Sequence, residues 1–267
     1  CCVASTGFAV ISAKNMVLSK YVYYMLYSEP VQAQLASMMG KGAYPSVNQK
    51  DVSQIQIPLP PLSVQEKVVT EIDRYQKIIN GTKQITDNYL PAVSTSASWP
   101  VVKLGMVFKL ASGKGLPTKN RFDGPYNVYG GNGITGKHSE YFVDSPTLTI
   151  GRVGEYCGAA HITSSKCWIT DNALMVTEYL TEVNPEYLEA IINQIDLNQY
   201  AKVGGQPSIS QSTVYNVPIP LPNIDVQNSI ASQIRYEKSI IQQNKKLAEI
   251  FVQKITDIIN NVWGITK

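Results

Sequence analysis

The sequence has few of the features that mark an enzyme, a secreted protein or a membrane protein. Only two histidines occur in 267 residues, and the four cysteines show no C-x-x-C spacing. A disulfide framework is therefore not expected, which favours a reducing cytoplasm. The sequence lacks a run of about 18 apolar residues, so no membrane span is expected. The net charge is only +3, too small by itself to indicate nucleic acid.

Charge is nevertheless distributed unevenly along the chain. Residues 103–152 hold seven Lys or Arg against three acids, whereas residues 178–196 hold five acids and no base. A basic stretch suits contact with phosphates, and an acidic stretch suits solvent or a protein. Ordinary scatter of surface charge explains the same pattern equally well, so other features must decide.

An internal repeat organises the chain. Residues 42–79 align without gaps to residues 204–241, at a constant offset of 162 and with 14 of 38 positions identical. With small gaps the match extends upstream, where LSKY (18–21) lies opposite NPEY (184–187). Each copy therefore predicts the same order of elements: a short strand, a helix, a Gly-rich loop, a P-L-P turn and a long helix.

The two copies are unequal in length. The second begins near Trp99, so the matching start of the first would lie roughly 65 residues upstream of Cys1, which predicts an N-terminally truncated piece of a tandem protein. Short β segments broken by Gly, Pro, Asn and Asp indicate a small mixed α+β domain between the helices. We expect four parts: the end of a first domain (1–61), a central helix (62–95), a second domain (96–223) and a C-terminal helix (224–267).

Apolar residues recur at helical spacing after each P-L-P turn. Ser63 and Glu66 predict a capping box for the first helix, and Asp225 predicts the cap of the second. The stripes are typical of a coiled-coil seam, which predicts that the helices pair with each other. Packing of each helix on its own domain is the open alternative. The proposed seam residues are Val64, Val68, Ile72, Ile79, Val226, Ile230, Ile234, Ile241, Phe251 and Ile255.

The stretch Gly131–Lys137 reads G-x-x-x-x-G-K, one residue short of a phosphate-binding loop. That loop requires Ser or Thr at the next position, because the hydroxyl ligates magnesium, but His138 follows here. The loop should also follow an apolar strand and open a helix, whereas the flanking segments are polar or strand-like. A glycine-rich turn between strands is the better interpretation.

Two further patterns suggest chemistry but have simpler explanations. The NPEY motif (184–187) is close to the N-P-P-[YF] motif of adenine methyltransferases, yet a helix start with its Asn as cap and its Pro at the first position explains it better. Cys157, His161 and Cys167 could be pictured as zinc ligands, but a fourth ligand and zinc-site spacing are lacking, so buried thiols are favoured. We therefore assign no catalytic residue, metal ligand or cofactor.

Together these features resemble the specificity subunit of type I restriction-modification systems. The most specific element is P-L-P-x-x-x-x-Q, which introduces both long helices as IPLPPLSVQEKV and IPLPNIDVQNSI. The supporting motifs are WPVVKLG, YNVYGGNGITGKH, TIGRVGEYCG, ITDNALMV and GGQPSIS. The resemblance covers essentially the whole chain.

The resemblance implies both a fold and a function. Each α+β module would be a target recognition domain that reads one half of a split sequence in double-stranded DNA. The long helices would pair as an antiparallel coiled coil and fix the distance between the half-sites. Such a subunit is noncatalytic and recruits modification (methyltransferase) subunits and motor-nuclease restriction subunits. The incomplete first module is expected to be incompetent, and a homodimer of the chain is left open.

Base reading requires donor and acceptor side chains on loops, while phosphate contacts require Lys, Arg or backbone amides. Asn, Gln, Arg and His suit sequence reading, and the lysines suit affinity and salt dependence. Each candidate could instead be a solvated loop residue, Arg152 could hold two turns in an ion pair, and GGQPSIS could merely cap a short helix. The DNA-binding candidates are Lys114, Lys119, Asn120, Arg121, Asn132, Lys137, His138, Arg152, Lys202, Gln206 and Ser208, with Lys41, Tyr44 and Ser46 in the first module.

Two other functions compete with this hypothesis. A protein-interaction scaffold would use the same modules and helices without sequence-specific DNA binding, and salt-dependent duplex binding with a sequence preference would separate the two. A methyltransferase with a fused recognition domain would bind S-adenosylmethionine, and we expect no such binding.

Overall fold

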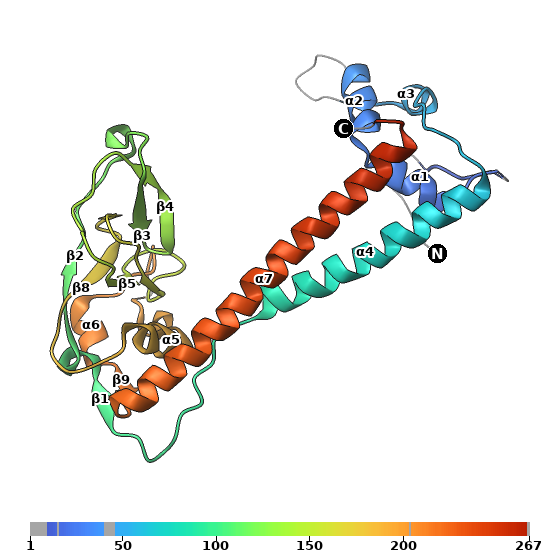
Figure 1. The fold of residues 1–267 in the computed structure, drawn as a ribbon. Helices are drawn as coiled ribbons and strands as arrows, with labels where there is room; N and C mark the ends of the chain where they lie inside the picture. The colour runs from blue at the N-terminus through green and yellow to red at the C-terminus, as the bar shows by residue number, and fades with distance from the viewer. Residues whose placement is uncertain (1–9, 15, 40–45, 203, 266–267) are drawn as a thin grey trace. The chain divides into compact units, whose positions relative to one another are not determined.

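The computed structural model describes residues 10–14, 16–39, 46–202 and 204–265. It divides into two compact units, which we treat separately (Figure 1). The helical unit comprises Cys1–Tyr89 with Ile240–Lys267, and the mixed unit comprises Leu90–Ser239. In the part of the chain that is described, no helix combines the length and apolarity needed to cross a membrane.

The strands of the mixed unit form three small sheets. The four-stranded sheet has the order β2-β8-β5-β6 and is antiparallel throughout. In the three-stranded sheet, of order β4-β3-β7, the β3–β7 pair is parallel. The strands are β1 (Val101–Lys103), β2 (Phe108–Ser112), β3 (Tyr126–Gly130), β4 (Gly133–His138), β5 (Leu148–Gly151), β6 (Ala160–Ile162), β7 (Trp168–Ile169), β8 (Ala173–Tyr179) and β9 (Pro218–Pro220), with β1 and β9 pairing antiparallel.

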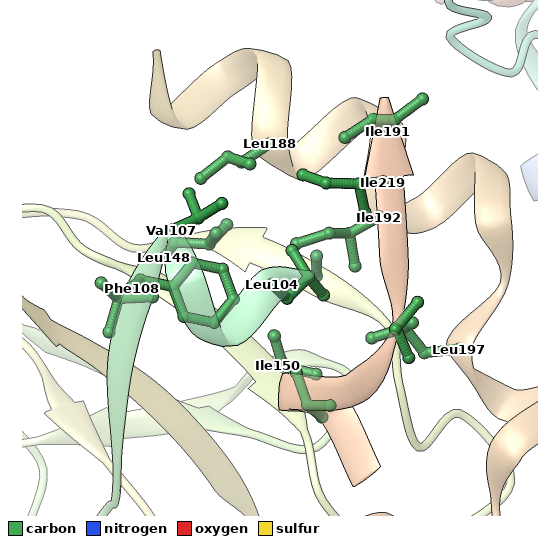
Figure 2. Close-up of a cluster of buried hydrophobic side chains, with 14 of the residues drawn as sticks. Leu104, Val107, Phe108, Leu148, Ile150, Leu188, Ile191, Ile192, Leu197 and Ile219 are labelled. Carbon is green, nitrogen blue, oxygen red and sulfur yellow. The ribbon is translucent and has the colours of Figure 1, made fainter. Parts of the chain in front are cut away.

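The main core of the mixed unit lies between the four-stranded sheet, the β1–β9 pair and helix α5 (Pro185–Ile195). Leu188, Ile191 and Ile192 of α5 face the side chains of Leu104 and Ile219 in Figure 2, and all five are almost fully buried. An amphipathic helix buries its apolar stripe on a sheet in this way because neither surface is stable in water alone. The expected mixed α+β class is confirmed. Short helices complete the unit: η1 (Leu104–Met106), η2 (Thr118–Asn120), η3 (Leu197–Tyr200) and α6 (Gln211–Asn216).

Among its described residues, the helical unit contains four helices of the first copy and the end of α7 (Ile224–Val262). The four are α1 (Ser19–Leu26), α2 (Glu29–Met38), α3 (Gln49–Ser53) and α4 (Leu62–Asn88). The long helices α4 and α7 have 27 and 39 residues. The first 16 residues of α7 belong to the mixed unit, so the division between the two units falls inside this helix. The expected division into four parts remains a prediction.

The structure reproduces the internal repeat at the level of helix starts. Helices α3 and α6 begin at Gln49 and Gln211, and α4 and α7 begin at Leu62 and Ile224, so both pairs differ by the repeat offset of 162. Asn48 and Ser210, also 162 apart, place their side chains as N-caps of α3 and α6. The repeat seen in the sequence is therefore also present in the structure. The last residue of the GGQPSIS motif, Ser210, is the N-cap of α6, so this motif does lead into the cap of a short helix.

The caps of the longer helices differ partly from expectation. Helix α4 has Pro61 at the N-cap and no side-chain cap, so the expected capping box of Ser63 with Glu66 is wrong. In α7 the side chain of Asn223 accepts from the Val226 amide at 3.0 Å, while Asp225 lies in the first turn. The cap of each helix, Pro61 or Asn223, thus lies two positions before the residue that the sequence pattern indicated. Helix α5 is capped by Asn184 with Pro in its first turn, as predicted for NPEY.

A buried glutamine explains the P-L-P-x-x-x-x-Q motif in both copies. Gln65 accepts from the Leu18 amide at 3.0 Å and donates to the Pro60 carbonyl at 2.8 Å. Gln227 accepts from the Asn184 amide at 2.9 Å and donates to the Pro222 carbonyl at 2.8 Å. The two Gln side chains are 0 and 1% exposed. Gln65 therefore connects its P-L-P turn to the start of α1, and Gln227 connects its turn to the start of α5. Buried polar groups are retained when they are fully paired, as here.

A tyrosine adds a third bond to each of these sites. The hydroxyl of Tyr21 in α1 donates to the Pro58 carbonyl at 2.8 Å, and that of Tyr187 in α5 donates to the Pro220 carbonyl at 2.7 Å. Burial raises the pKa of Tyr187 to about 12, so it acts as a neutral donor at physiological pH. We call the three hydrogen bonds of each copy, made by its buried Gln and Tyr, the turn clamp.

The G-x-x-x-x-G-K stretch forms a β-hairpin. Strands β3 and β4 pair antiparallel with Gly130 opposite Gly133, and β4 ends at His138 without a following helix. Gly133 has φ +80°, a conformation that L side chains rarely adopt. The interpretation of this stretch as a turn between strands is confirmed.

Helices α4 and α7 contact each other within the helical unit, running in opposite directions (Figure 1). The rings of Tyr75 and Phe251 lie 5.1 Å apart, and Ile255 packs against the cluster that contains Val68 and Ile72. That cluster also includes Tyr21, Tyr24 and Met25 of α1. Val64 is 39% exposed, and Ile79 and Ile241 are half-buried. Coiled-coil pairing along the helices remains a prediction.

The beginning of α7 packs on the mixed unit. Ile234 is 3% exposed in the core of that unit, and Ile230 packs against it. Their placement in a helix-pairing seam is corrected, because these side chains join the helix to its own domain. The period of an apolar stripe does not say which surface will bury it.

The turn clamp predicts a large effect of one substitution. Gln227→Ala should lower the free energy of unfolding by about 2 kcal/mol, because it leaves the half-buried Asn184 amide and the buried Pro222 carbonyl without their partner. Urea unfolding of the full chain measures this. The matched control is Gln233→Ala on the same helix, where the exposed side chain bonds only Glu237. Equal unfolding midpoints for the two variants would contradict the role of the clamp.

Candidate nucleic-acid interface

Five predicted DNA-binding residues gather on neighbouring loops of the mixed unit. We call Lys114, Arg152, Lys202, Gln206 and Ser208 the loop cluster. Lys114, Arg152, Lys202 and Gln206 are exposed, and Ser208 is half-buried. Backbone hydrogen bonds connect their loops, so residues nearly a hundred positions apart belong to one surface.

The turn before β8 is the centre of this surface. The Lys114 amide donates to the Ile169 carbonyl at 2.9 Å, and the Arg152 amide donates to the Asn172 carbonyl at 2.8 Å. The guanidinium of Arg152 also reaches the carbonyl of Asp171 at 3.5 Å. This is a weak contact to backbone, so the suggested internal ion pair of Arg152 is not what the structure shows. Its charge stays on the exposed surface.

The loop after η3 is attached to the same surface. The Gly154 amide donates to the Pro207 carbonyl at 2.9 Å, and the Ile209 amide donates to the Arg152 carbonyl at 2.9 Å. The Lys202 amide donates to the Ser208 carbonyl at 2.9 Å. These bonds fix the backbone of the cluster and leave its long side chains available, which suits contact with a ligand.

Close backbone approach brings the β3–β4 hairpin to the loop cluster. A Cβ atom added at Gly151 would lie 2.1 Å from the Gly131 carbonyl oxygen, and one added at Gly131 would lie 2.8 Å from the Val153 carbonyl oxygen. Only glycine permits this approach. The neighbouring Asn132 is exposed at the tip of the hairpin. It therefore extends the loop cluster by one amide side chain.

A second group of candidates lies along the hairpin and the segment around η2. Lys119, Asn120 and Lys137 are exposed, and Arg121 is half-buried. A Cβ atom added at Gly136 would lie 3.7 Å from a guanidinium nitrogen of Arg121, which places Arg121 against β4. Within the described residues, the Nε atom of Arg121 is buried without a hydrogen-bond partner.

His138 has a different place from the one expected of a base-reading residue. It is 3% exposed, and its Nδ1 accepts from the Phe122 amide at 3.2 Å. Its ring stacks on Phe122 and meets the edge of Trp168, with centroids 6.2 and 5.3 Å apart. We therefore remove His138 from the candidate surface and assign it to holding the η2 segment on the hairpin.

Sequence reasoning missed the aromatic side chains beneath and beside these loops. Lys114 lies over the ring of Phe142, 4.3 Å from its centroid, and Phe142 packs against Trp168. Phe122 and Tyr156 are 63% and 56% exposed next to the cationic loops. The basic-aromatic run around Arg121 was the available signal, because exposed rings beside cations suit nucleic acid.

Of the three DNA-binding candidates in the first copy, the structure describes only Ser46. Lys41 and Tyr44 lie outside the described residues, and Ser46 is exposed. Their role remains a prediction.

The three residues that the sequence offered as zinc ligands, Cys157, His161 and Cys167, lie in sheltered surroundings within the mixed unit. Cys157 and Cys167 are free and buried, and burial raises the pKa of both thiols. Burial lowers the pKa of His161, whose Nε2 is buried without a hydrogen-bond partner among the described residues. In the ranges that the structure describes, no three His, Cys, Asp or Glu side chains are grouped so as to hold a metal ion.

Comparison with known proteins identifies the family. The type I restriction modification DNA specificity domain matches residues 2–88 and 97–250, and the chain therefore belongs to this family. A type I restriction enzyme EcoprrI specificity subunit from Escherichia coli is 28% identical over 134 residues, 48% of this chain and 33% of that protein. The MjaIX specificity subunit from Methanocaldococcus jannaschii is 26% identical over 78 residues, 29% of this chain and 18% of that protein. The chain thus matches a third or less of the length of these relatives.

Solved structures show the same fold. One, described for the complex assembly and conformational transition of a type I restriction-modification system, covers 98% of this chain and 75% of its own, at 19% identity and a TM-score of 0.64. The S subunit of the type I system from M. genitalium covers 91% of this chain and 72% of its own, at 15% identity and a TM-score of 0.57.

The loop cluster makes a testable prediction about salt. Lys114→Ala should weaken duplex binding similarly for all sequences and lower the slope of log K against log salt by about one, as expected for one lost phosphate contact. Titration at several salt concentrations measures the slope. Lys103→Ala is the control, because Lys103 is an exposed lysine of the same unit on β1. A slope that falls equally in both variants, or in neither, would contradict the assignment.

Proposed function

We propose that the chain is a noncatalytic DNA sequence-recognition subunit of a type I restriction-modification complex. Its mixed unit reads one half of a bipartite target in double-stranded DNA. The first copy, of which residues 10–14, 16–39 and 46–61 are described, belongs to a domain that reads the other half. The chain recruits modification (methyltransferase) subunits and motor-nuclease restriction subunits, which supply the chemistry.

The observation that carries this proposal is the loop cluster with its neighbouring hairpin. Three exposed cations, Lys114, Arg152 and Lys202, share a surface with the amides of Gln206 and Asn132. Cations supply contacts to phosphates, and amide side chains pair with base edges. Hydrogen bonds between loops hold the backbone in place before the ligand arrives, and such pre-organisation lowers the entropic cost of binding.

Selection from a random duplex library tests the proposal. The full chain, alone and with its modification subunits, should enrich a defined half-site, and the binding should weaken steeply as salt rises. Salt-independent binding or binding without any sequence preference would favour the protein-interaction scaffold instead.

Substitutions of Gln206 and Lys202, which belong to the same loop, should affect base reading and phosphate binding separately. Gln206→Ala should relax the base preference at one position of the enriched site, with a cost of about 1–3 kcal/mol for the preferred base. Lys202→Ala should lower affinity without changing the enriched sequence, because a phosphate contact carries no sequence information. The same library selection gives both results. An unchanged motif in Gln206→Ala would exclude this residue from base reading.

We further propose that α4 and α7 act as a spacer between half-sites. Inserting seven residues after Ile79 and seven after Ile241 adds roughly 10 Å to each helix, about three base pairs of duplex. The gap between enriched half-sites should lengthen by that amount when a complete pair of recognition domains is present. An unchanged gap would contradict the spacer role.

A further inference from the structure

The turn clamp creates a problem of specificity for a repeated chain. Gln65 and Gln227 make equivalent hydrogen bonds, and so do Tyr21 and Tyr187. Helix α1 docked on α7, or α5 docked on α4, would satisfy the same bonds. The clamp alone therefore does not distinguish the correct partner from the repeat-equivalent one, in the same chain or in a second copy.

Charges beside the clamp are reversed between the two copies. Lys20 of α1 pairs with Asp73 of α4 at 2.5 Å, whereas Glu186 of α5 pairs with Arg235 of α7 at 2.7 Å. Asp73 and Arg235 are separated by the repeat offset of 162, and Lys20 and Glu186 precede the equivalent clamp tyrosines by one residue. The same two places thus carry a cation–anion pair in one copy and an anion–cation pair in the other.

Neighbouring contacts also differ between the copies. The Tyr24 hydroxyl donates to Asp73 from a side chain that is 8% exposed, and Ala190 occupies the corresponding place in α5. Lys238 pairs with Glu189 at 2.8 Å, where the first copy has uncharged residues. Exchanged docking would therefore remove the acceptor of a buried hydroxyl as well as bring like charges together.

We propose that these reversed ion pairs are specificity determinants. They favour docking of each short helix on the long helix of its own copy, and they disfavour docking on the equivalent helix of the other copy. Exchange would place Lys20 against Arg235 and Glu186 against Asp73. Each partly exposed pair stabilises the protein only slightly. Specificity, however, depends on the difference between the two dockings, and here both interactions change sign together.

Variants of identical composition test this proposal. The double variant D73R/R235D reverses only the long helices, so native docking becomes repulsive and exchanged docking attractive. The fourfold variant K20E/D73R/E186K/R235D restores opposite charges in the native docking. All chains carry Tyr24→Phe, so that the loss of its bond to Asp73 is common to them, and serines at residues 1 and 2.

Disulfide trapping in the full chain reports which docking occurs. Tyr23 and Gln76 line the same groove of the helical unit, so the pair Y23C/Q76C reports native docking. Lys238 is the repeat equivalent of Gln76, so the pair Y23C/K238C reports exchanged docking, within a chain or between two. Each Cys pair is combined with each charge pattern, and the ratio of exchanged to native disulfide is compared.

We expect the ratio to rise roughly tenfold in D73R/R235D, because two weak pairs change sign, and to return to within about twofold of its starting value in the fourfold variant. The difference should shrink in about 1 M salt, where the Debye length falls to about 3 Å. Loss of both disulfides in the double variant, with recovery in the fourfold variant, also supports the proposal. An unchanged ratio in D73R/R235D, or a fourfold variant that behaves like it, would overturn it.

Discussion

The fold of both copies depends on one buried glutamine that joins the P-L-P turn to a short helix. Gln65 and Gln227 each hold a turn carbonyl and a helix-start amide, and a buried tyrosine bonds the same turn. Proline supplies a rigid turn, and the backbone carbonyls of that turn need hydrogen-bond partners where they are shielded from water. The clamp meets this need at the point where the long helix begins.

In the mixed unit, the same clamp supports the proposed DNA surface. Tyr187 lies in α5, whose Leu188 and Ile192 fill the core beneath the sheets. The strands end in loops that carry the exposed cations and amides. Backbone hydrogen bonds between these loops hold them in place where there is no helix or strand pairing. Stability is thus provided by the core and the clamp, while the loops are free to vary in the side chains that contact a ligand.

Much of this organisation was predictable from the sequence, because repeats and periodic stripes leave clear patterns. The offset of 162 fixed the equivalence of α4 with α7, and NPEY was correctly interpreted as a helix start. Other features depended on tertiary contacts that no local pattern contains. Ile234 fits a helix-pairing stripe but packs on the mixed unit, and His138 is polar in a loop-rich segment but is buried among aromatic rings. The convergence of Arg152 and Gln206 likewise required the fold.

The most direct test of the proposed role is a genome-wide map of methyladenine in cells that express the matching modification subunit, with and without this chain. The account predicts a sequence motif whose methylation appears only when the chain is present. A palindromic motif would indicate two copies of the mixed unit acting together, and a split asymmetric motif would indicate two different reading domains. Methylation that is the same with and without the chain would contradict the account.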